Sequence, residues 1–265
     1  MTKTTILLFS SMLLSTSLFS DNLKIKTYEH SNSTYVKLLI PSSLYEKYGE
    51  SNYIKNFNIK VDNTNILNLY MSKYFVRNPI IKFNYKNINP NNEITLSLNV
   101  SENKYIDISK KIKHTKHEFK LKNLSIEESK KNSKKLKISN DIFKEKSINN
   151  VLNNLYGTDK TTTINSIIDV PKEVLGDTLI NINTKRGFES IVVFRTDDDY
   201  VTKAIFELSP NIILDINFKL EIQYLDKEKN INIIVVAKGI DGKLYKSSES
   251  IKVIRCIADC NGGGG

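Results

Sequence analysis

The strongest constraint on the fold is a stretch in which apolar and polar residues alternate without a fault. It runs from Ile216 to Tyr224 and reads Ile-Asn-Phe-Lys-Leu-Glu-Ile-Gln-Tyr. Successive side chains of a β-strand point to opposite faces of the sheet, so this period of two predicts a strand with one buried face. The same alternation occurs at 94–100 and, over fewer residues, at 57–61.

Other short apolar runs are spread along the chain, with turn signals between them. They are predicted as strands at 35–40, 179–183, 191–195, 203–208, 231–237 and 250–254. Asp241-Gly242 lies between two of the apolar runs and suits a tight hairpin turn, which needs residues that accept a positive φ. Many short strands with frequent turns predict an all-β fold of antiparallel β-sandwiches rather than an α/β fold.

One helix is predicted ahead of the second group of strands. The apolar residues of 148–155 recur at the spacing i, i+3, i+4 and i+7, which places them on one helix face. Ser147 is a suitable N-cap and Gly157 a suitable C-terminal stop. We expect the apolar face of this helix to pack against the second β domain.

A lysine-rich segment, 110–137, separates the two groups of strands and contains few apolar residues. Such a segment buries too little apolar surface to offset the entropy lost on ordering, so it is predicted to be a solvated linker. The predicted domains are therefore a β-sandwich at 22–112, a basic linker at 113–139 and a second β-sandwich at 140–255.

The N-terminal residues predict export from the cytoplasm. Residues 1–20 combine one early lysine, an apolar stretch and a serine before a polar segment, which is typical of a secretory signal peptide. The apolar part is shorter than the roughly 20 residues that span a bilayer, so no membrane anchor is expected. The net charge of +10 is concentrated in the linker, and for an exported protein it does not favour nucleic acid as a partner.

The sequence lacks the motifs of common enzymes. It contains no phosphate-binding loop, no G-x-S-x-G elbow and no H-E-x-x-H, so neither a catalytic site nor a cofactor is predicted. His30, His114 and His117 lie outside the predicted strands; the last two are spaced to bind a metal ion, but a polar linker is the favoured interpretation. The run Asp197-Asp198-Asp199 is interpreted as a solvated turn rather than a cation site.

The C-terminal segment 256–265 holds the one set of residues that points to chemistry. It contains the only two cysteines of the chain, Cys256 and Cys260, and ends in Gly262, Gly263, Gly264 and Gly265. Glycine has the largest conformational freedom of any residue, so these four are expected to form a mobile arm. An exposed thiol is open to oxidation and exchange, and its presence on such an arm suits covalent cargo.

A disulfide between Cys256 and Cys260 is the structural alternative. It would close a loop of a few residues at the very end of the chain and would remove little entropy from the unfolded state. The spacing is not C-x-x-C, so a thioredoxin-type activity is not supported. The residues themselves leave open which cysteine carries cargo.

Several segments resemble SoxYZ, the sulfur carrier of bacterial thiosulfate oxidation. The second half is similar to SoxY at 155–157 (Leu-Tyr-Gly), 167–171 (Ile-Ile-Asp-Val-Pro), 176–179 (Gly-Asp-Thr-Leu), 206–210 (Phe-Glu-Leu-Ser-Pro), 239–245 (Gly-Ile-Asp-Gly-Lys-Leu-Tyr) and 250–253 (Ser-Ile-Lys-Val). The first half resembles SoxZ at 74–79 (Tyr-Phe-Val-Arg-Asn-Pro) and in the strand 94–100.

The resemblance implies two immunoglobulin-like β-sandwiches, which are separate subunits in the family and are fused here. It also implies a periplasmic carrier without its own catalytic site, which holds sulfur intermediates on a tail cysteine. Cys260, directly ahead of Asn261 and the glycines, is the first candidate, and Cys256 is the second. The implied partners are the haem enzyme SoxAX, the hydrolase SoxB and a sulfane dehydrogenase.

The tail departs from the family pattern. Members of the family end in Gly-Gly-Cys-Gly-Gly, whereas here Ile257-Ala258-Asp259 precedes Cys260, and Cys256 is additional. A diverged two-cysteine protein that exchanges disulfides or transfers sulfur outside the Sox cycle is therefore the alternative, because a second thiol can attack an adduct on the first. A structural or adhesive β-sandwich protein is a third hypothesis.

Overall fold

The computed structural model describes residues 24–30, 33–39, 54–62, 64–72, 80–86, 93–100, 104–111, 136–184, 187–209, 212–220, 222 and 228–254. Its elements are β1 (Lys24–His30), β2 (Ser33–Leu39), β3 (Ile54–Val61), β4 (Thr64–Met71), β5 (Ile80–Lys86), β6 (Glu93–Val100), β7 (Lys104–Lys111), η2 (Asn140–Lys144), α2 (Ile148–Tyr156), β8 (Thr161–Thr163), β9 (Ile168–Asp169), β10 (Glu173–Val174), β11 (Thr178–Thr184), β12 (Phe188–Arg195), β13 (Thr202–Leu208), β14 (Ile212–Leu220), β15 (Lys229–Gly239) and β16 (Leu244–Val253). The predicted all-β fold, with one α-helix leading into the second half, is confirmed.

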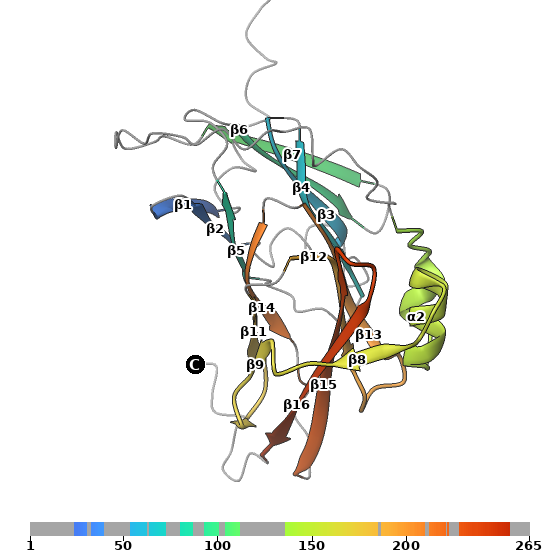
Figure 1. Ribbon diagram of the computed structural model, residues 1–265. Helices are drawn as coiled ribbons and strands as arrows, with labels where there is room; N and C mark the ends of the chain where they lie inside the picture. The colour runs from blue at the N-terminus through green and yellow to red at the C-terminus, as the bar shows by residue number, and fades with distance from the viewer. Residues whose placement is uncertain are drawn as a thin grey trace, which may run out of the picture.

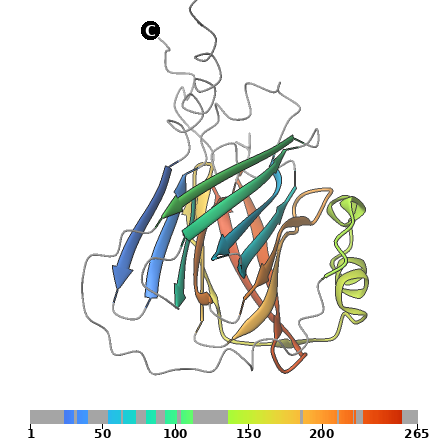
Figure 2. The ribbon, with the colours of Figure 1, turned by 90° about the horizontal axis from the view of Figure 1, so that it is seen from above.

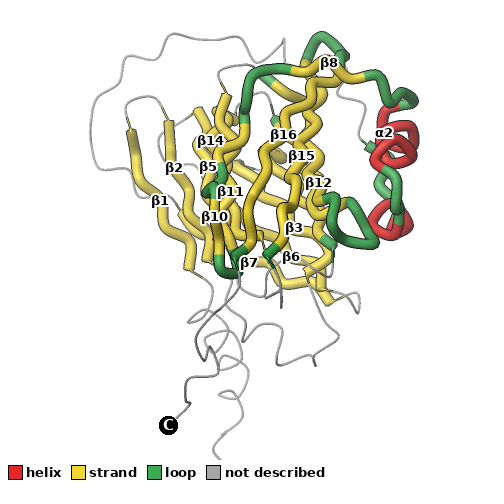
Figure 3. Tube along the Cα trace, turned by 90° about the horizontal axis from the view of Figure 1, so that it is seen from below, coloured by secondary structure: helices red, strands yellow, loops and turns green. Residues whose placement is uncertain are grey.

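The strands form two sheets that face each other (Figures 1 and 3). One sheet has six strands in the order β1-β2-β5-β14-β11-β9. The other has ten, in the order β10-β16-β15-β12-β13-β4-β3-β6-β7, with β8 paired to β16. Among the described strands, pairing is antiparallel except for the short strands β8 and β10, which run parallel to β16.

Both halves of the chain contribute to both sheets. The first half supplies β1, β2 and β5 to the six-stranded sheet and β4, β3, β6 and β7 to the ten-stranded sheet. The two halves meet where β5 pairs with β14 and β4 pairs with β13, both antiparallel. The fold is thus a pair of sandwiches joined edge to edge, with the first half next to the second in each sheet (Figure 2).

The main apolar core lies between the two sheets and continues through both halves. Val36 and Phe57 belong to it in the first half, and Phe206 and Phe218 in the second, all fully buried. The rings of Phe206 and Phe218 lie 5.4 Å apart between centroids, one from each sheet. In β2 and β5 buried residues alternate with partly exposed ones, as expected for strands with one face on a core.

A third layer covers the outer face of the ten-stranded sheet in the second half (Figure 3). Val235 faces the core between the sheets, whereas Ile234 and Val236 belong to a second cluster with Val151 and Leu152 of α2. Burial of both faces explains why the apolar run in β15 is nearly continuous rather than alternating.

The helix prediction is confirmed in position and capping. The hydroxyl of Ser147 accepts a hydrogen bond from the backbone N–H of Asn150 at 3.4 Å. Gly157 has φ of 74° and donates its N–H to the carbonyl of Asn153 at 2.9 Å, which ends the helix. Among the residues that the structure describes, no helix is long and apolar enough to cross a bilayer.

Most predicted strands lie within one to four residues of the observed ones. The hairpin is confirmed, because Ala237 of β15 pairs with Tyr245 of β16 and Gly242 has φ of 77°. The strand expected at 216–224 is shifted, since β14 starts at Ile212 and ends at Leu220. β14 pairs with both β5 and β11, and these pairings extend it toward the N-terminus, ahead of the alternating segment that begins at Ile216.

Two polar clusters bridge the halves at their junctions. At β4·β13, the carboxylate of Glu207 accepts hydrogen bonds from Asn68 Nδ2 at 2.9 Å and from the Tyr70 hydroxyl at 3.1 Å. At β5·β14, the carboxylate of Asp215 accepts one from Asn84 Nδ2 at 3.2 Å. Each junction therefore has an acidic residue of the second half that binds amide groups of the first.

Candidate functional site

The predicted carrier tail lies outside the residues that the structure describes. This holds for both candidate cysteines, Cys256 and Cys260, and for the glycines 262–265, so the choice between the cysteines stays a prediction. His114 and His117, interpreted as part of a polar linker rather than as a metal site, also lie outside them. What the structure does describe is the strand from which the tail continues, β16, and the elements around its end.

β16 is held on both sides up to the start of the tail. β15 pairs with it antiparallel along its whole length, and β10 pairs in parallel with its last residues. The backbone N–H of Lys252 donates to the carbonyl of Lys172 at 2.8 Å, and that of Ile254 donates to the carbonyl of Val174 at 2.9 Å. The chain is therefore fixed through Ile254, two residues before Cys256.

Burial and ion pairs reinforce this anchor. The side chain of Val253 is almost fully buried in the core between the sheets. Lys252 points outward, and its ammonium lies 3.3 Å from the carboxylate of Glu228 and 3.6 Å from that of Glu173. The hydrogen bond and charge of Glu228, with a further contribution from Glu173, raise the pKa of Lys252.

The anchor sets how far each cysteine reaches. A fully extended chain spans at most about 3.3–3.6 Å per residue. Cys256, two residues beyond Ile254, is held within about 7 Å of it, whereas Cys260, six residues beyond, reaches at most about 20 Å. In full extension, Cys260 can therefore lie about three times as far from Ile254 as Cys256 can.

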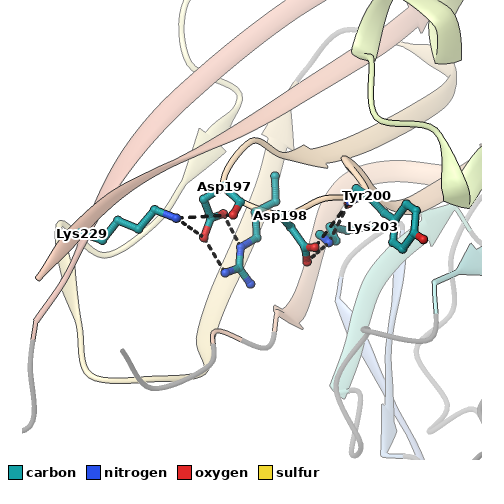
Figure 4. A network of polar contacts seen from close by, with 6 residues as sticks. Asp197, Asp198, Tyr200, Lys203 and Lys229 are labelled. Carbon is teal, nitrogen blue, oxygen red and sulfur yellow. Dashed lines mark hydrogen bonds and ion pairs between the residues drawn. The ribbon is translucent and has the colours of Figure 1, made fainter. Parts of the chain in front are cut away.

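A second cluster of chemically interesting side chains lies at the β12–β13 turn (Figure 4). Arg195 Nε and Nη2 donate to the two carboxylate oxygens of Asp197 at 2.5 and 2.7 Å. Lys229 Nζ lies 3.7 Å from the same carboxylate. Lys203 Nζ donates to Asp198 Oδ2 at 2.5 Å.

The prediction of a solvated turn at 197–199 is wrong for its first residue. The side chain of Asp197 is only 5% exposed, and that of Asp198 is 25% exposed. Strand alternation gives no signal for this, because Asp197 lies beyond the end of β12 at Arg195. The partners Lys203 and Lys229 come from other strands, and the sequence alone does not pair them.

Nearby charges and burial shift the pKa values of these side chains in opposite directions. Burial by itself would raise the pKa of Asp197, but the hydrogen bond and charge of Arg195 outweigh it and hold this pKa below its ordinary value. Lys203 likewise holds the pKa of Asp198 down, while burial lowers the pKa of Lys203 itself. The carboxylates of Asp197 and Asp198 are thus occupied by cations of the chain, so this cluster stiffens the turn rather than offering a vacant ligand set.

No metal centre is assembled in the described part of the chain. Within those ranges, no group of three or more His, Cys, Asp or Glu side chains is placed to hold a metal ion. The expectation that His30 lies outside the strands is wrong, because it is the last residue of β1. The end of β16 is therefore the candidate functional region, because it positions the tail.

Comparisons with known proteins add little to this description. No protein-family model matches the chain, and no curated protein matches it either. Among solved structures, the chain is similar to the central fibronectin-III array of RIM-binding protein, with 8% identity over 89% of this chain and 68% of that one. The TM-score of 0.26 is too low to support a conclusion about this chain.

Proposed function

We propose that this protein is a periplasmic sulfur carrier of the thiosulfate-oxidising type, which holds sulfur intermediates covalently on Cys260. The observation that supports it most is the combination of two cysteines and four glycines on a segment that continues from a strand anchored through Ile254. The resemblance of 239–245 and 250–253 to SoxY concerns the same hairpin and strand, β15 and β16.

In such a carrier, the protein itself contributes only the cysteine thiol, and partner enzymes catalyse the reactions. The Cys260 thiol loses its proton and forms an S–S bond to the outer sulfur of thiosulfate, and the two electrons released go to the haem enzyme SoxAX. SoxB then adds water across the terminal S–SO₃ bond, which releases sulfate and two protons and leaves a persulfide on the cysteine. The carrier supplies the thiol and the reach, and a sulfane dehydrogenase oxidises the remaining sulfur.

The two halves support the proposal in a second way. SoxZ-like and SoxY-like subunits must associate for such a carrier, and here the corresponding halves pair at β4·β13 and β5·β14 within one chain. In this proposal the first half stabilises the sheets from which the tail continues. The charged side chains near the tail base, Lys252 among them, contact partner enzymes rather than nucleic acid or membrane.

Intact mass spectrometry of protein purified from its host, grown with thiosulfate, tests the proposal. We expect added masses of one or more sulfur atoms or of thiosulfate, lost on treatment with a reductant and lost in Cys260→Ser. Cys256→Ser is the matched control and keeps the adducts. A uniform deficit of two hydrogens would favour the disulfide-exchange alternative, and an unmodified thiol with no effect of either substitution would contradict both thiol functions.

A further inference from the structure

The outer face of the six-stranded sheet carries an ordered set of side chains in the first half. In β2 and β5 every second residue, Val36 and Phe83 among them, is buried in the core between the sheets. The residues between them therefore lie on the opposite face of the sheet. They include the cross-strand pairs Leu39 with Ile80, Lys37 with Lys82 and Tyr35 with Asn84. The helix α2 packs on the other sheet, so it does not cover this face (Figure 3).

Two lysines of this set lie directly opposite each other. Lys37 of β2 is the register partner of Lys82 of β5, and both side chains are partly exposed. Residues opposed in this way have Cβ atoms only about 4.5–5.5 Å apart, and like charges in such a pair destabilise a sheet. Lys26 of β1 is in turn opposite Lys37, which places a third lysine at the same register. A negative charge close to this row would therefore stabilise the sheet.

Among the described residues, no carboxylate supplies that negative charge by forming an ion pair with Lys37 or Lys82. Asp215 lies on the same face, but its carboxylate is occupied by the side-chain amides of three asparagines. These amides, at 3.2, 3.0 and 3.1 Å, belong to Asn84, Asn181 and Asn217. Lys219 on the neighbouring strand β14, in contrast, has a partner in Asp177 at 2.7 Å. The two opposed lysines are thus available to an anion from outside the chain.

The outward side chains are also ordered by polarity along the strands. Leu39 and Ile80 form an apolar pair at the end of β2 and the start of β5, and both are partly exposed. Lys37 and Lys82 follow two residues further along, and Tyr35 lies two residues beyond Lys37, so the set spans roughly 13 Å. The surface of a bilayer has the same order in depth, with hydrocarbon below anionic headgroups and with tyrosine rings typical of the headgroup level.

We propose that this end of β2 and β5 is a peripheral membrane-binding surface for anionic phospholipids. Leu39 and Ile80 enter the boundary of the hydrocarbon, and the ammonium groups of Lys37 and Lys82 bind headgroup phosphates. A nucleic acid would also complement the lysines, but it would leave the apolar pair without a partner. In a protein contact the apolar residues lie at the centre of a polar rim, whereas here they lie at one end. Membrane binding through these residues does not depend on sulfur chemistry at Cys260.

Co-sedimentation with vesicles tests this surface. Protein purified from its host is mixed with vesicles of phosphatidylglycerol and phosphatidylcholine in equal parts, and the bound fraction gives a partition coefficient. The double variant Lys37→Gln/Lys82→Gln is expected to lower this coefficient about tenfold to thirtyfold, because each lysine near an anionic surface contributes about fivefold. Lys160→Gln/Lys243→Gln is the matched control: it removes the same charge from exposed positions of the second half and should change the coefficient by less than about twofold.

Further variants test the separate parts of the surface. Lys37→Arg/Lys82→Arg keeps both charges and should keep vesicle binding. Leu39→Ser is expected to weaken binding about threefold to tenfold at high salt as well as at low salt, because the apolar contribution is not screened. Ile80→Ser replaces it if Leu39→Ser fails to fold.

Three results would overturn the membrane-binding surface. The first is no binding of the natural protein to the anionic vesicles, and the second is an equal loss in the lysine variant and its charge-matched control. The third is a loss in the lysine variant that affects binding to a thymidine oligonucleotide but not to vesicles, which would assign the lysines to a nucleic acid. None of these results bears on the loading of Cys260, so the carrier function would stand or fall separately.

Discussion

At the scale of single residues, the ion pairs of the β12–β13 turn show how a surface-like sequence becomes part of a folded core. Arg195 and Asp197 form a two-pronged contact at 2.5 and 2.7 Å and are 10% and 5% exposed. Lys203 is 1% exposed and donates both to Asp198 and to the carbonyl of Tyr200. Buried charges tolerate such positions only when they are paired and hydrogen-bonded, so removing one partner is costly.

Asp197→Asn is therefore expected to lower the free energy of unfolding by about 3 kcal/mol, because it removes the carboxylate charge that forms the two-pronged contact with the buried guanidinium of Arg195. Urea unfolding followed by circular dichroism measures the change. Asp199→Asn, at an exposed position in the same turn, is the control and should change stability by less than about 0.5 kcal/mol. Equal losses in the two variants would contradict a structural role for the Arg195–Asp197 pair.

The same carboxylates predict an acid-sensitive fold. Asp197 and Asp198 have pKa values below their ordinary value in the folded protein, so their stabilising contribution is fully present above the ordinary aspartate pKa of about 4. It is lost as the pH falls below that value through the depressed pKa. We expect the urea midpoint to fall steeply below about pH 4 and to fall less steeply in Asp197→Asn. Parallel pH profiles for the two proteins would count against this assignment.

The candidate site could be predicted at this scale only in part. The capping roles of Ser147 and Gly157 follow from local preferences and are confirmed. The burial of Asp197 does not, because Lys229 and the surrounding core come from distant strands. The cargo role of Cys260 stays a prediction, since it lies outside the described residues.

At the scale of elements, the joint between β4 and β13 depends on Glu207. Its two carboxylate oxygens accept hydrogen bonds from Asn68, Tyr70 and the backbone N–H of Leu136. Burial first, and then the charge of Glu207, raise the pKa of Tyr70. The carboxylate thus links the two halves to the segment that leads into η2.

Glu207→Ala is expected to lower the free energy of unfolding by about 2–3 kcal/mol, because it removes the acceptor of three donors at a partly buried site. Glu189→Ala is the control: that carboxylate lies 2.9 Å from Lys238 in a partly exposed ion pair, whose loss costs at most about 1 kcal/mol. Chemical unfolding of both variants makes the comparison. A loss in Glu207→Ala no larger than in the control would mean that the joint does not depend on this residue.

The sequence predicts a strand where apolar and polar residues alternate regularly. It does not predict a strand that forms only because neighbouring strands pair with it. β4 contains two asparagines, which have low strand propensity, yet it forms because it pairs with β3 on one side and β13 on the other. β1 and β7 lie at the edges of their sheets, and their lysines obscure the apolar pattern. The near-continuous apolar run of β15 predicts a strand. That both faces of this strand are buried could not be predicted without knowing that α2 packs on the outer face.

At the scale of the whole molecule, two sandwiches share both of their sheets and one core. The all-β class and the leading helix follow from sequence periodicity. The edge-to-edge joining does not, because β4 and β13 are separated by more than a hundred residues and no local signal specifies that they pair. The predicted boundaries at 112 and 140 lie in or beside a segment outside the described residues and stay predictions.

The shared sheets predict that the halves stay together after the chain is cut between them. A protease recognition sequence inserted after Asn123 and cleaved in the native protein should leave one particle that elutes from a sizing column with the intact chain. In denaturant the same sample should separate into two peptides, which is the control for complete cleavage. Two smaller species under native conditions would show that the β4·β13 and β5·β14 pairings do not hold without the covalent connection.

The parallel strand at the end of β16 has a mechanical consequence. A force applied to the tail along the axis of β16 would load the ladder with β15, from Lys229 to Lys238, in shear. In that direction the hydrogen bonds must break together, whereas a force perpendicular to the strand would open them one at a time. β10 adds its bonds at the very point where the force enters, at Lys252 and Ile254. Tension on the tail is thereby spread over the sheet, and the base strand resists being unravelled from its end.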